Sequence, residues 1–334
     1  MRQAMAEAVV GDDVFHEDPT VRLLEEETAA VLGKEASLFV PSGCMGNEIA
    51  VAIQTKRGDA LLLHKDSHLV LTEAAAITEL LGRKYHRVDG DRGRMRPEDV
   101  SSELAASLAT SGTIAMVEVE NTINWGSGSI YPLPQLEAIG KAARARGLPV
   151  HLDGARLWNA SAATGIAPAT YAAVADTVMV CYSKGLGAPI GSAIAGTKAA
   201  VQEARLARKM FGGGMRQVGV VAAAALHGLK HHRDRLPEDH RRARRLAEAI
   251  ASTPGLRLDP GEIESNIVIA EIEEPHDRVQ AFVATVESEG VRMNAFGGPG
   301  RFRAVTHLDI DDAGIDRAIA AIRLAAASVL QAKH

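Results

Sequence analysis

Short apolar runs alternate with longer segments of helical periodicity over the first two thirds of the chain. Strands separated by helices are typical of parallel β-α-β units, and strands apolar on both faces are typical of a sheet that is covered on both sides. The pattern therefore predicts a doubly wound, mostly parallel α/β domain. We expect strands at 37–40, 60–63, 113–119, 150–152 and 177–182, and helices at 69–81, at 134–146 and from about 157.

The pattern changes after about residue 230, where a charged stretch precedes a long basic helix. The sequence predicts two domains, a large one over residues 1–232 and a smaller C-terminal α/β domain over 233–334, which is an ordinary size for a small domain. In the second we expect helices at 238–251, 277–288 and 313–330, a strand at 266–270, and short strands near Val291 and Phe302.

Composition narrows the classes of protein that are compatible with this pattern. The 334 residues are 46% apolar and 24% charged, with a net charge of −5, so a mildly acidic globular chain is expected rather than a general polyanion binder. The only cysteines, Cys44 and Cys181, cannot form a disulfide framework. No apolar run reaches the length of a membrane span, and the first residues lack the apolar stretch of a secretory signal. We expect a cytoplasmic protein with neither a membrane nor a nucleic acid as its partner.

The run Arg241-Arg242-Ala243-Arg244-Arg245 is the one feature that is compatible with nucleic-acid binding. No aromatic residues interleave with its basic ones, so we favour a solvated helix face.

Two polar residues follow neighbouring buried strands, where open α/β sheets bind their ligands. Asp153 comes directly after the strand at 150–152, and Lys184 follows the strand at 177–182, 31 residues later. One β-α-β unit of this length places both residues at the same sheet edge. The ordinary alternatives are a local ion pair of Asp153 with Arg156 and a surface lysine in a loop. The pairing suits pyridoxal phosphate, whose aldehyde is bound by a lysine and whose ring nitrogen is held by an aspartate.

Two further strand ends carry candidate residues. The segment Pro41-Ser42-Gly43-Cys44-Met45-Gly46-Asn47 precedes a helical pattern, and a helix start of small residues can bind phosphate, although it can equally be an ordinary turn. His68 follows the strand at 60–63, where an imidazole can stack on a flat ring or move protons, or be purely structural.

Five sequence blocks lie at 11–14, 17–21, 183–187, 212–217 and 305–309, and the most specific of them are Ser-Lys-Gly-Leu-Gly and Gly-Gly-Gly-Met-Arg-Gln. Together they resemble the L-threonine aldolases, which are pyridoxal-phosphate enzymes of the aspartate-aminotransferase fold. The similarity extends over nearly the whole chain in the correct order.

The resemblance implies roles for individual residues, none of them a metal ligand. For the cofactor, Lys184 would bind it covalently, Asp153 would pair with the ring nitrogen, His68 would stack on the ring and handle protons, and Gly43 and Cys44 would hold the phosphate with help from Ser183. For the substrate, Arg303 would clamp the carboxylate, and Arg156 would approach both the substrate and the ring hydroxyl. Lys209 and Arg216 would lie around the active site and are candidates for residues that a neighbouring subunit contributes. The family forms dimers of dimers with shared active sites, so a homodimer or homotetramer is expected.

The chain departs from the family pattern at several positions. In the run Asn121-Thr122-Ile123-Asn124, Ile123 stands where the family usually has a histidine. Cys44 and Phe15 stand where the family commonly has Thr and Tyr. The short segment with a serine that the family usually carries before Gly11 is absent. Because isoleucine cannot hydrogen-bond a substrate hydroxyl, we expect preference to move toward bulkier or aryl β-substituents.

The leading hypothesis is cleavage of threonine-type β-hydroxy-α-amino acids to glycine and an aldehyde. The absence of the second histidine keeps a rival open, a pyridoxal-phosphate-dependent β-eliminating lyase that releases pyruvate and ammonia, because fold alone does not fix function. A non-catalytic interaction protein, supported only by the basic helix near Arg241, is the third hypothesis.

Overall fold

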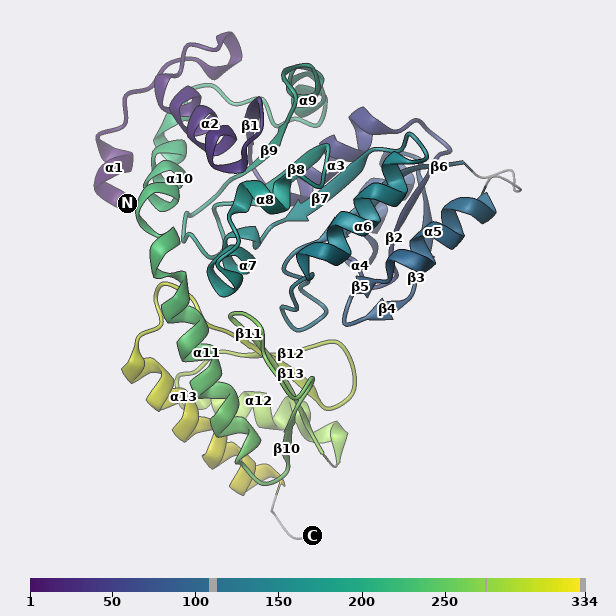
Figure 1. Ribbon diagram of the computed structural model, residues 1–334. Coiled ribbons are helices and arrows are strands. Elements are labelled where there is room, and N and C mark those ends of the chain that lie inside the picture. Colours follow the sequence, from purple (N-terminus) through teal and green to yellow (C-terminus); the bar gives the residue numbers. More distant parts are fainter. Residues whose placement is uncertain (108–112, 274, 331–334) are drawn as a thin grey trace. The chain divides into compact units, whose positions relative to one another are not determined.

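The computed structural model describes residues 1–107, 113–273 and 275–330 (Figure 1). The chain forms two compact units. The larger comprises residues 1–123 and 130–234, and the smaller comprises 124–129 and the chain from 235 onward. In the described part of the chain, every helix is too short or too polar to cross a bilayer.

The larger unit is built on a seven-stranded sheet with the order β1-β9-β8-β7-β6-β2-β3. The strands β8, β7, β6, β2 and β3 pair in parallel, whereas β9 runs antiparallel to both β1 and β8. The strands are β1 (Ala36–Val40), β2 (Ala60–His64), β3 (Lys84–Val88), β6 (Ile114–Glu120), β7 (Val150–Gly154), β8 (Thr177–Cys181) and β9 (Ser192–Gly196), and the hairpin strands β4 (Gly90–Asp91) and β5 (Arg94–Met95) pair separately.

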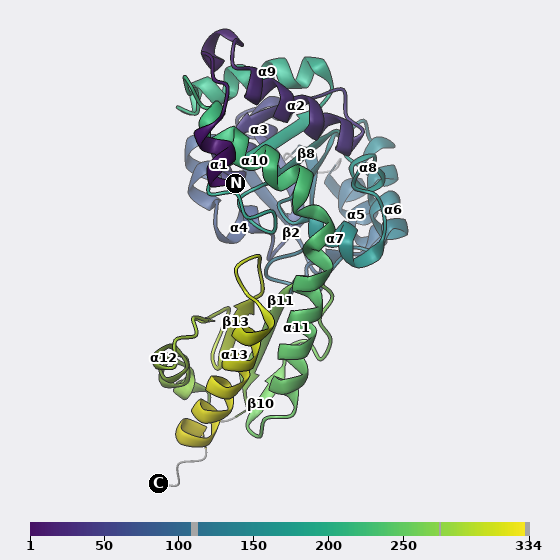
Figure 2. The same ribbon diagram turned by 90° about the vertical axis from the view of Figure 1, so that its left-hand side faces the viewer.

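Helices cover both faces of this sheet (Figures 1 and 2). Alternate residues of β1 separate the faces: Leu38 and Val40 pack with α3 and α9, whereas the Ser37 hydroxyl donates to the Glu25 carbonyl of α2 on the other side. The helices are α1 (Arg2–Ala6), η1 (Asp13–Phe15), α2 (Pro19–Leu32), α3 (Gly43–Gln54), α4 (His68–Leu71), η2 (Ala76–Leu80), α5 (Pro97–Ala106), α6 (Leu133–Arg144), α7 (Leu157–Thr164), α8 (Pro168–Ala172), α9 (Lys198–Met210) and α10 (Gly219–His231).

The smaller unit packs helices on an antiparallel four-stranded sheet with the order β10-β11-β13-β12. Its core joins apolar side chains of the sheet to those of α11, α12 and α13, with Phe282 and Phe302 in ring contact at 4.9 Å. The elements are α11 (Leu236–Ala251), β10 (Leu256–Leu258), β11 (Ile267–Ile272), η5 (His276–Arg278), α12 (Val279–Ser288), β12 (Asn294–Ala295), β13 (Arg301–Val305), α13 (Asp312–Ala325) and η6 (Ala326–Leu330), and η4 (Arg233–Arg235) precedes α11.

The predicted fold class, a mostly parallel doubly wound sheet with a smaller α/β unit, is confirmed. The single helix expected at 69–81 is wrong, because the chain forms α4, a turn at Thr72 and Glu73, and then the π-helical η2. Periodicity suggested one helix since Leu69, Ile77 and Leu81 do enter one core, but the turn lets the Glu73 carboxylate reach polar partners inside the protein. The strand expected near Val291 lies slightly later, as β12.

Candidate active site

A cavity of about 280 Å³ opens in the larger unit around residues that follow β1, β2, β7 and β8. Asp153 and Lys184, predicted to share a sheet edge, both line it, together with His68. The remaining lining residues are Pro41, Ser42, Gly43, Cys44, Asn47, Glu73, Met179, Cys181, Ser183, Pro189 and Ile190.

Lys184 is half-buried in the turn that follows β8. The Gly187 N–H donates to the Lys184 carbonyl at 2.9 Å, and the Ser183 N–H donates to the Gly191 carbonyl at 3.2 Å, so the backbone of this turn is held on both sides of the lysine. Burial raises the pKa of the neighbouring Cys181 thiol, and the positive charge of Lys184 opposes that shift. The Lys184 amine therefore lies in the same cavity as a Cys181 thiol that stays protonated.

Asp153 lies near the end of β7 with 1% of its surface exposed. Its Oδ1 accepts the backbone N–H of Ala155 at 3.0 Å, and its Oδ2 accepts the Asn47 amide at 2.9 Å. A buried carboxylate is stabilised only by such donors or by a cation.

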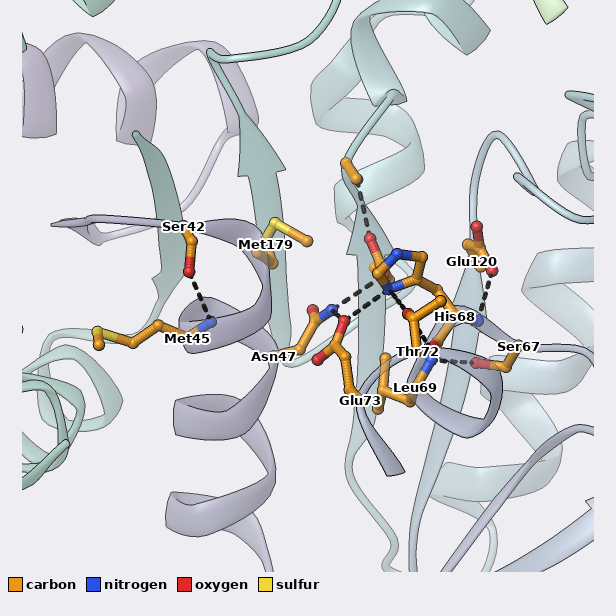
Figure 3. Close-up of polar contacts among 12 residues, drawn as sticks. Ser42, Met45, Asn47, Ser67, His68, Leu69, Thr72, Glu73, Glu120 and Met179 are labelled. Atoms are coloured by element: carbon orange, nitrogen blue, oxygen red, sulfur yellow. Dashed lines mark hydrogen bonds and ion pairs between the residues drawn. The ribbon is translucent and has the colours of Figure 1, made fainter. Parts of the chain in front are cut away.

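The start of α3 lines the cavity with backbone donors. Ser42 caps the helix by accepting the Met45 N–H at 3.2 Å (Figure 3), and the first-turn N–H groups of Gly43 and Cys44 have no intrahelical acceptors. A Cβ on Gly43 would lie 2.9 Å from the Cys181 sulfur, so a larger residue would collide with the end of β8. Glycine thus lets the positive end of the helix approach this strand closely.

His68 begins α4 and is paired with Glu73 (Figure 3). Its Nδ1 lies 2.6 Å from Glu73 Oε1, and its backbone N–H donates to Glu120 Oε2 at 3.1 Å. Burial alone would lower the pKa of His68, but the hydrogen bond to Glu73 and the negative charges of Asp153, Glu73 and Glu120 together raise it. The imidazole is therefore oriented, with Nδ1 engaged by a carboxylate.

The sequence did not single out Asn47, Glu73 or Glu120 as site residues. Glu120 ends β6, next to Asp153 in the register of the sheet. A carboxylate at the end of an apolar run is the sequence signal that identifies Asp153, and the same signal is present at Glu120. Asn47, in a helix interior, offered no such signal.

Arg156 directly precedes α7, three residues after Asp153. Desolvation lowers the pKa of its guanidinium, and the negative charge of Glu120 opposes that shift more than Asp153 does. The residue therefore interacts electrostatically with the end of β6 as well as with β7.

Arg303 belongs to the smaller unit, on β13. Its Nη1 donates to Asn124 Oδ1 at 3.0 Å, and its guanidinium lies 4.2 Å from the centre of the Phe296 ring, which stacks on Trp125. An amide and an aromatic face thus fix the orientation of this cation.

Lys209 and Arg216 lie outside the cavity lining. Lys209 is exposed near the end of α9, and Arg216 pairs with Asp12 at 2.6 Å and lies over the Phe15 ring. The structure of one chain does not bring them together with Lys184.

The residues of the cavity fit pyridoxal phosphate. The set offers an amine for an aldehyde, a buried carboxylate for a ring nitrogen, an imidazole for a ring face, and a helix start for a phosphate. The need for glycine at position 43, where a Cβ would crowd the approach of the helix to β8, is the structural observation that agrees with a phosphate cradle.

Comparisons with known proteins agree with this donor set. The profile of the family described as beta-eliminating lyase matches residues 1–273. The chain is 36% identical over 315 residues to low-specificity L-threonine aldolase 1 of Arabidopsis thaliana, covering 93% of this chain and 88% of that protein. It is 33% identical over 313 residues to the low specificity L-threonine aldolase of Escherichia coli K12, covering 93% and 90%.

The fold is similar to that of solved structures as well. The threonine aldolase of Leishmania major superposes with a TM-score of 0.82 at 21% identity, covering 97% of this chain and 94% of that one. The chain therefore belongs to the beta-eliminating lyase family and, by homology to the low-specificity L-threonine aldolases, is a threonine aldolase-like, pyridoxal-phosphate-dependent lyase.

Proposed function

We propose that this protein cleaves threonine- and allo-threonine-type β-hydroxy-α-amino acids to glycine and an aldehyde. The observation that carries the proposal is that Lys184, Asp153, His68 and the first turn of α3 line one cavity. When bound there, pyridoxal phosphate supplies an electron sink for the electron pair released as the Cα–Cβ bond breaks.

The cavity residues would hold the cofactor in a fixed orientation. Lys184 would bind its aldehyde carbon, and Asp153 would accept a hydrogen bond from its ring nitrogen and so keep that nitrogen protonated. Gly43 and Cys44, with Ser183, would donate to the phosphate at the positive end of α3. These contacts act on opposite ends of a flat ring, so they also set which face of the ring meets His68.

His68 is the candidate for holding or moving the proton of the substrate β-hydroxyl. Because Glu73 engages Nδ1, the Nε2 atom is the one left to face a substrate, as in other imidazoles oriented by a carboxylate. Glu73 therefore orients the His68 imidazole without itself contacting the substrate.

Arg303 would bind the substrate carboxylate, with Arg156 assisting near the ring hydroxyl. Asn124 and Phe296 hold the guanidinium of Arg303 in one plane, which suits a bidentate carboxylate contact. A substrate carboxylate held in one place restricts rotation about the bond between the substrate nitrogen and Cα. The resulting orientation determines which of the bonds to Cα breaks.

We also propose the wider organisation of the protein. Residues 1–232 would form the cofactor-binding domain and 233–334 the C-terminal domain, in a cytoplasmic homodimer or homotetramer with shared active sites. Lys209 and Arg216 would then serve a neighbouring subunit, consistent with their position away from their own cavity. A free amino acid, not a nucleic acid or a membrane, would be the partner.

The test is a product assay on purified protein incubated with pyridoxal phosphate. We expect a visible absorbance band that is absent in Lys184→Ala, and glycine plus an aldehyde from L-threonine, L-allo-threonine or β-phenylserine. Ammonia and a 2-oxo acid in place of glycine, which is 2-oxobutanoate from threonine and pyruvate from L-serine, would establish the β-eliminating alternative that the apolar Ile123 leaves open. A protein that stays colourless would contradict the cofactor assignment.

The substrate preference can be tested at Ile123. This side chain is 1% exposed and packs against Gly93, where a Cβ would be too close to it. We predict that Ile123→His raises kcat/KM for L-threonine relative to β-phenylserine by about tenfold, because a histidine can hydrogen-bond the hydroxyl of the small substrate. Ile123→Val, which keeps an apolar side chain, is the control, and equal ratios in both variants would contradict the idea.

A further inference from the structure

One amide, that of Asn47, links Asp153 to the pair of Glu73 and His68 through hydrogen bonds. Figure 3 shows Asn47 beside Glu73 and His68. Asn47 lies on α3 with 1% of its surface exposed. Its Nδ2 donates to Asp153 Oδ2 at 2.9 Å and to Glu73 Oε1 at 3.1 Å, and the same Glu73 oxygen contacts His68 Nδ1. The two hydrogens of one amide are thus divided between two carboxylates.

His151 fixes the orientation of the Asn47 amide by contacting its oxygen, Oδ1. The Gln54 amide donates to Thr177 Oγ1 at 2.7 Å, so the Thr177 hydroxyl hydrogen can go to His151 Nδ1, 2.8 Å away. Burial lowers the pKa of His151 to about 4, so the ring is neutral and one nitrogen carries a hydrogen. Since Asn47 Nδ2 donates to two carboxylates, its Oδ1 must accept from the ring, and the hydrogen is on Nε2. That hydrogen is donated to Asn47 Oδ1 at 3.0 Å, which places Nδ2 toward the carboxylates.

The groups that face His68 are mostly acidic. Glu73 follows α4, Asp153 lies on β7 and Glu120 on β6, while the Lys184 amine and the protonated Cys44 thiol line the same cavity. The second oxygen of Glu73, Oε2, is buried without a hydrogen-bond partner among the described residues. Asn47 is therefore the donor that Glu73 and Asp153 share, and its loss would remove one hydrogen bond from each carboxylate.

We propose that Asn47 is a positioning residue that couples the Asp153 carboxylate to the pair of Glu73 and His68, with His151 setting the direction of its amide. The inference rests on the proposed function for the identity of the ring that Asp153 and His68 hold. Asn47 needs no contact with substrate: it donates one amide hydrogen to the carboxylate at the ring nitrogen and the other to the carboxylate at the imidazole.

The experiment follows the titration of His68 by NMR in the full chain labelled on histidine, with the resonance assigned from the spectrum of His68→Gln. In Asn47→Leu, which has a similar volume and no donor, we expect the midpoint of His68 to rise by about one pH unit, because a carboxylate that loses one hydrogen bond holds a shared proton more strongly. Pyridoxal phosphate, titrated by absorbance, should bind about tenfold more weakly.

Thr55→Val is the matched control, because it removes a buried hydroxyl at the end of the same helix that donates to the Val51 carbonyl, not to a carboxylate. It should leave the His68 midpoint in place. Asn47→Asp, which has nearly the same shape, is the second variant if the leucine variant does not fold, and it should shift the midpoint in the same direction.

An unchanged His68 midpoint in the Asn47 variants, or an equal shift in Thr55→Val, would overturn the coupling. The titration needs no cofactor, so this failure is distinct from failure of the proposed function, which would appear as wild-type protein that binds no pyridoxal phosphate. A shift confined to the Asn47 variants supports the coupling whatever the substrate is.

Discussion

At the scale of single residues, the polar groups inside the protein make its stability depend on pH. Burial lowers the pKa of His151 in the larger unit and of His240 in the smaller unit to about 4. An unfolded histidine titrates near 6.5, so between these values the unfolded chain binds more protons than the folded one. The folded state is therefore favoured above about pH 6.5 and loses stability as the pH falls toward 4.

We predict that the free energy of unfolding decreases from pH 6.5 to 4 by an amount on the order of 3 kcal/mol for each of these two histidines. Urea unfolding at a series of pH values measures this slope. His151→Gln and His240→Gln should each flatten it, although both variants are less stable at pH 7. A slope that is the same in wild type and both variants would show that other groups govern acid unfolding.

At the scale of elements, one carboxylate organises three segments of the larger unit. Asp18 is fully buried and caps α2 by accepting the N–H groups of Thr20 and Val21. Its Oδ2 also accepts the N–H of Gly11, at 3.2 Å, and that of Gly219 at the start of α10, at 2.9 Å. The N-terminal segment, α2 and α10 are therefore joined by a single side chain.

We predict that Asp18→Ala lowers the free energy of unfolding by about 3 kcal/mol, because several buried N–H groups lose their acceptor together. Asp311→Ala is the control: this exposed residue caps α13 with one hydrogen bond, to Gly314, and its loss should cost about 1 kcal/mol. Urea unfolding compares the two variants, and equal losses would mean that Asp18 acts as an ordinary cap.

The elements also show what the sequence could and could not predict. Apolar runs located β1, β2, β6, β7 and β8, and the strand ends located Lys184 and Asp153, because burial and chemistry are both visible in local sequence. Asn47 and Glu73 belong to the site through contacts between segments 26 residues apart, which periodicity does not report. The same contact explains the missed break after α4, since a buried polar contact outweighed the helical pattern.

At the scale of the whole molecule, the proposed sharing of active sites between subunits depends on Lys209 and Arg216. Arg216 pairs with Asp12 and is largely exposed, while the buried pair of Arg208 with Asp13, at 2.7 Å, fixes the end of α9 against the N-terminal segment. These contacts join the segments that carry both cations to the N-terminal segment. Exposed cations outside their own cavity are suited to completing an anion site on another copy of the chain.

Mixing two inactive variants tests this directly. Suppose that each site uses Lys184 from one subunit and Arg216 from its neighbour. Lys184→Ala and Arg216→Ala homomers would then both be inactive, but a hybrid dimer would contain one site with neither substitution. Unfolding and refolding an equal mixture gives hybrids as half of the dimers, so we predict about a quarter of the wild-type activity per subunit.

Activity measured in the mixture but in neither variant alone supports shared sites. If the mixture stays inactive, or if Arg216→Ala keeps full activity by itself, Arg216 does not complete the site of a neighbouring subunit.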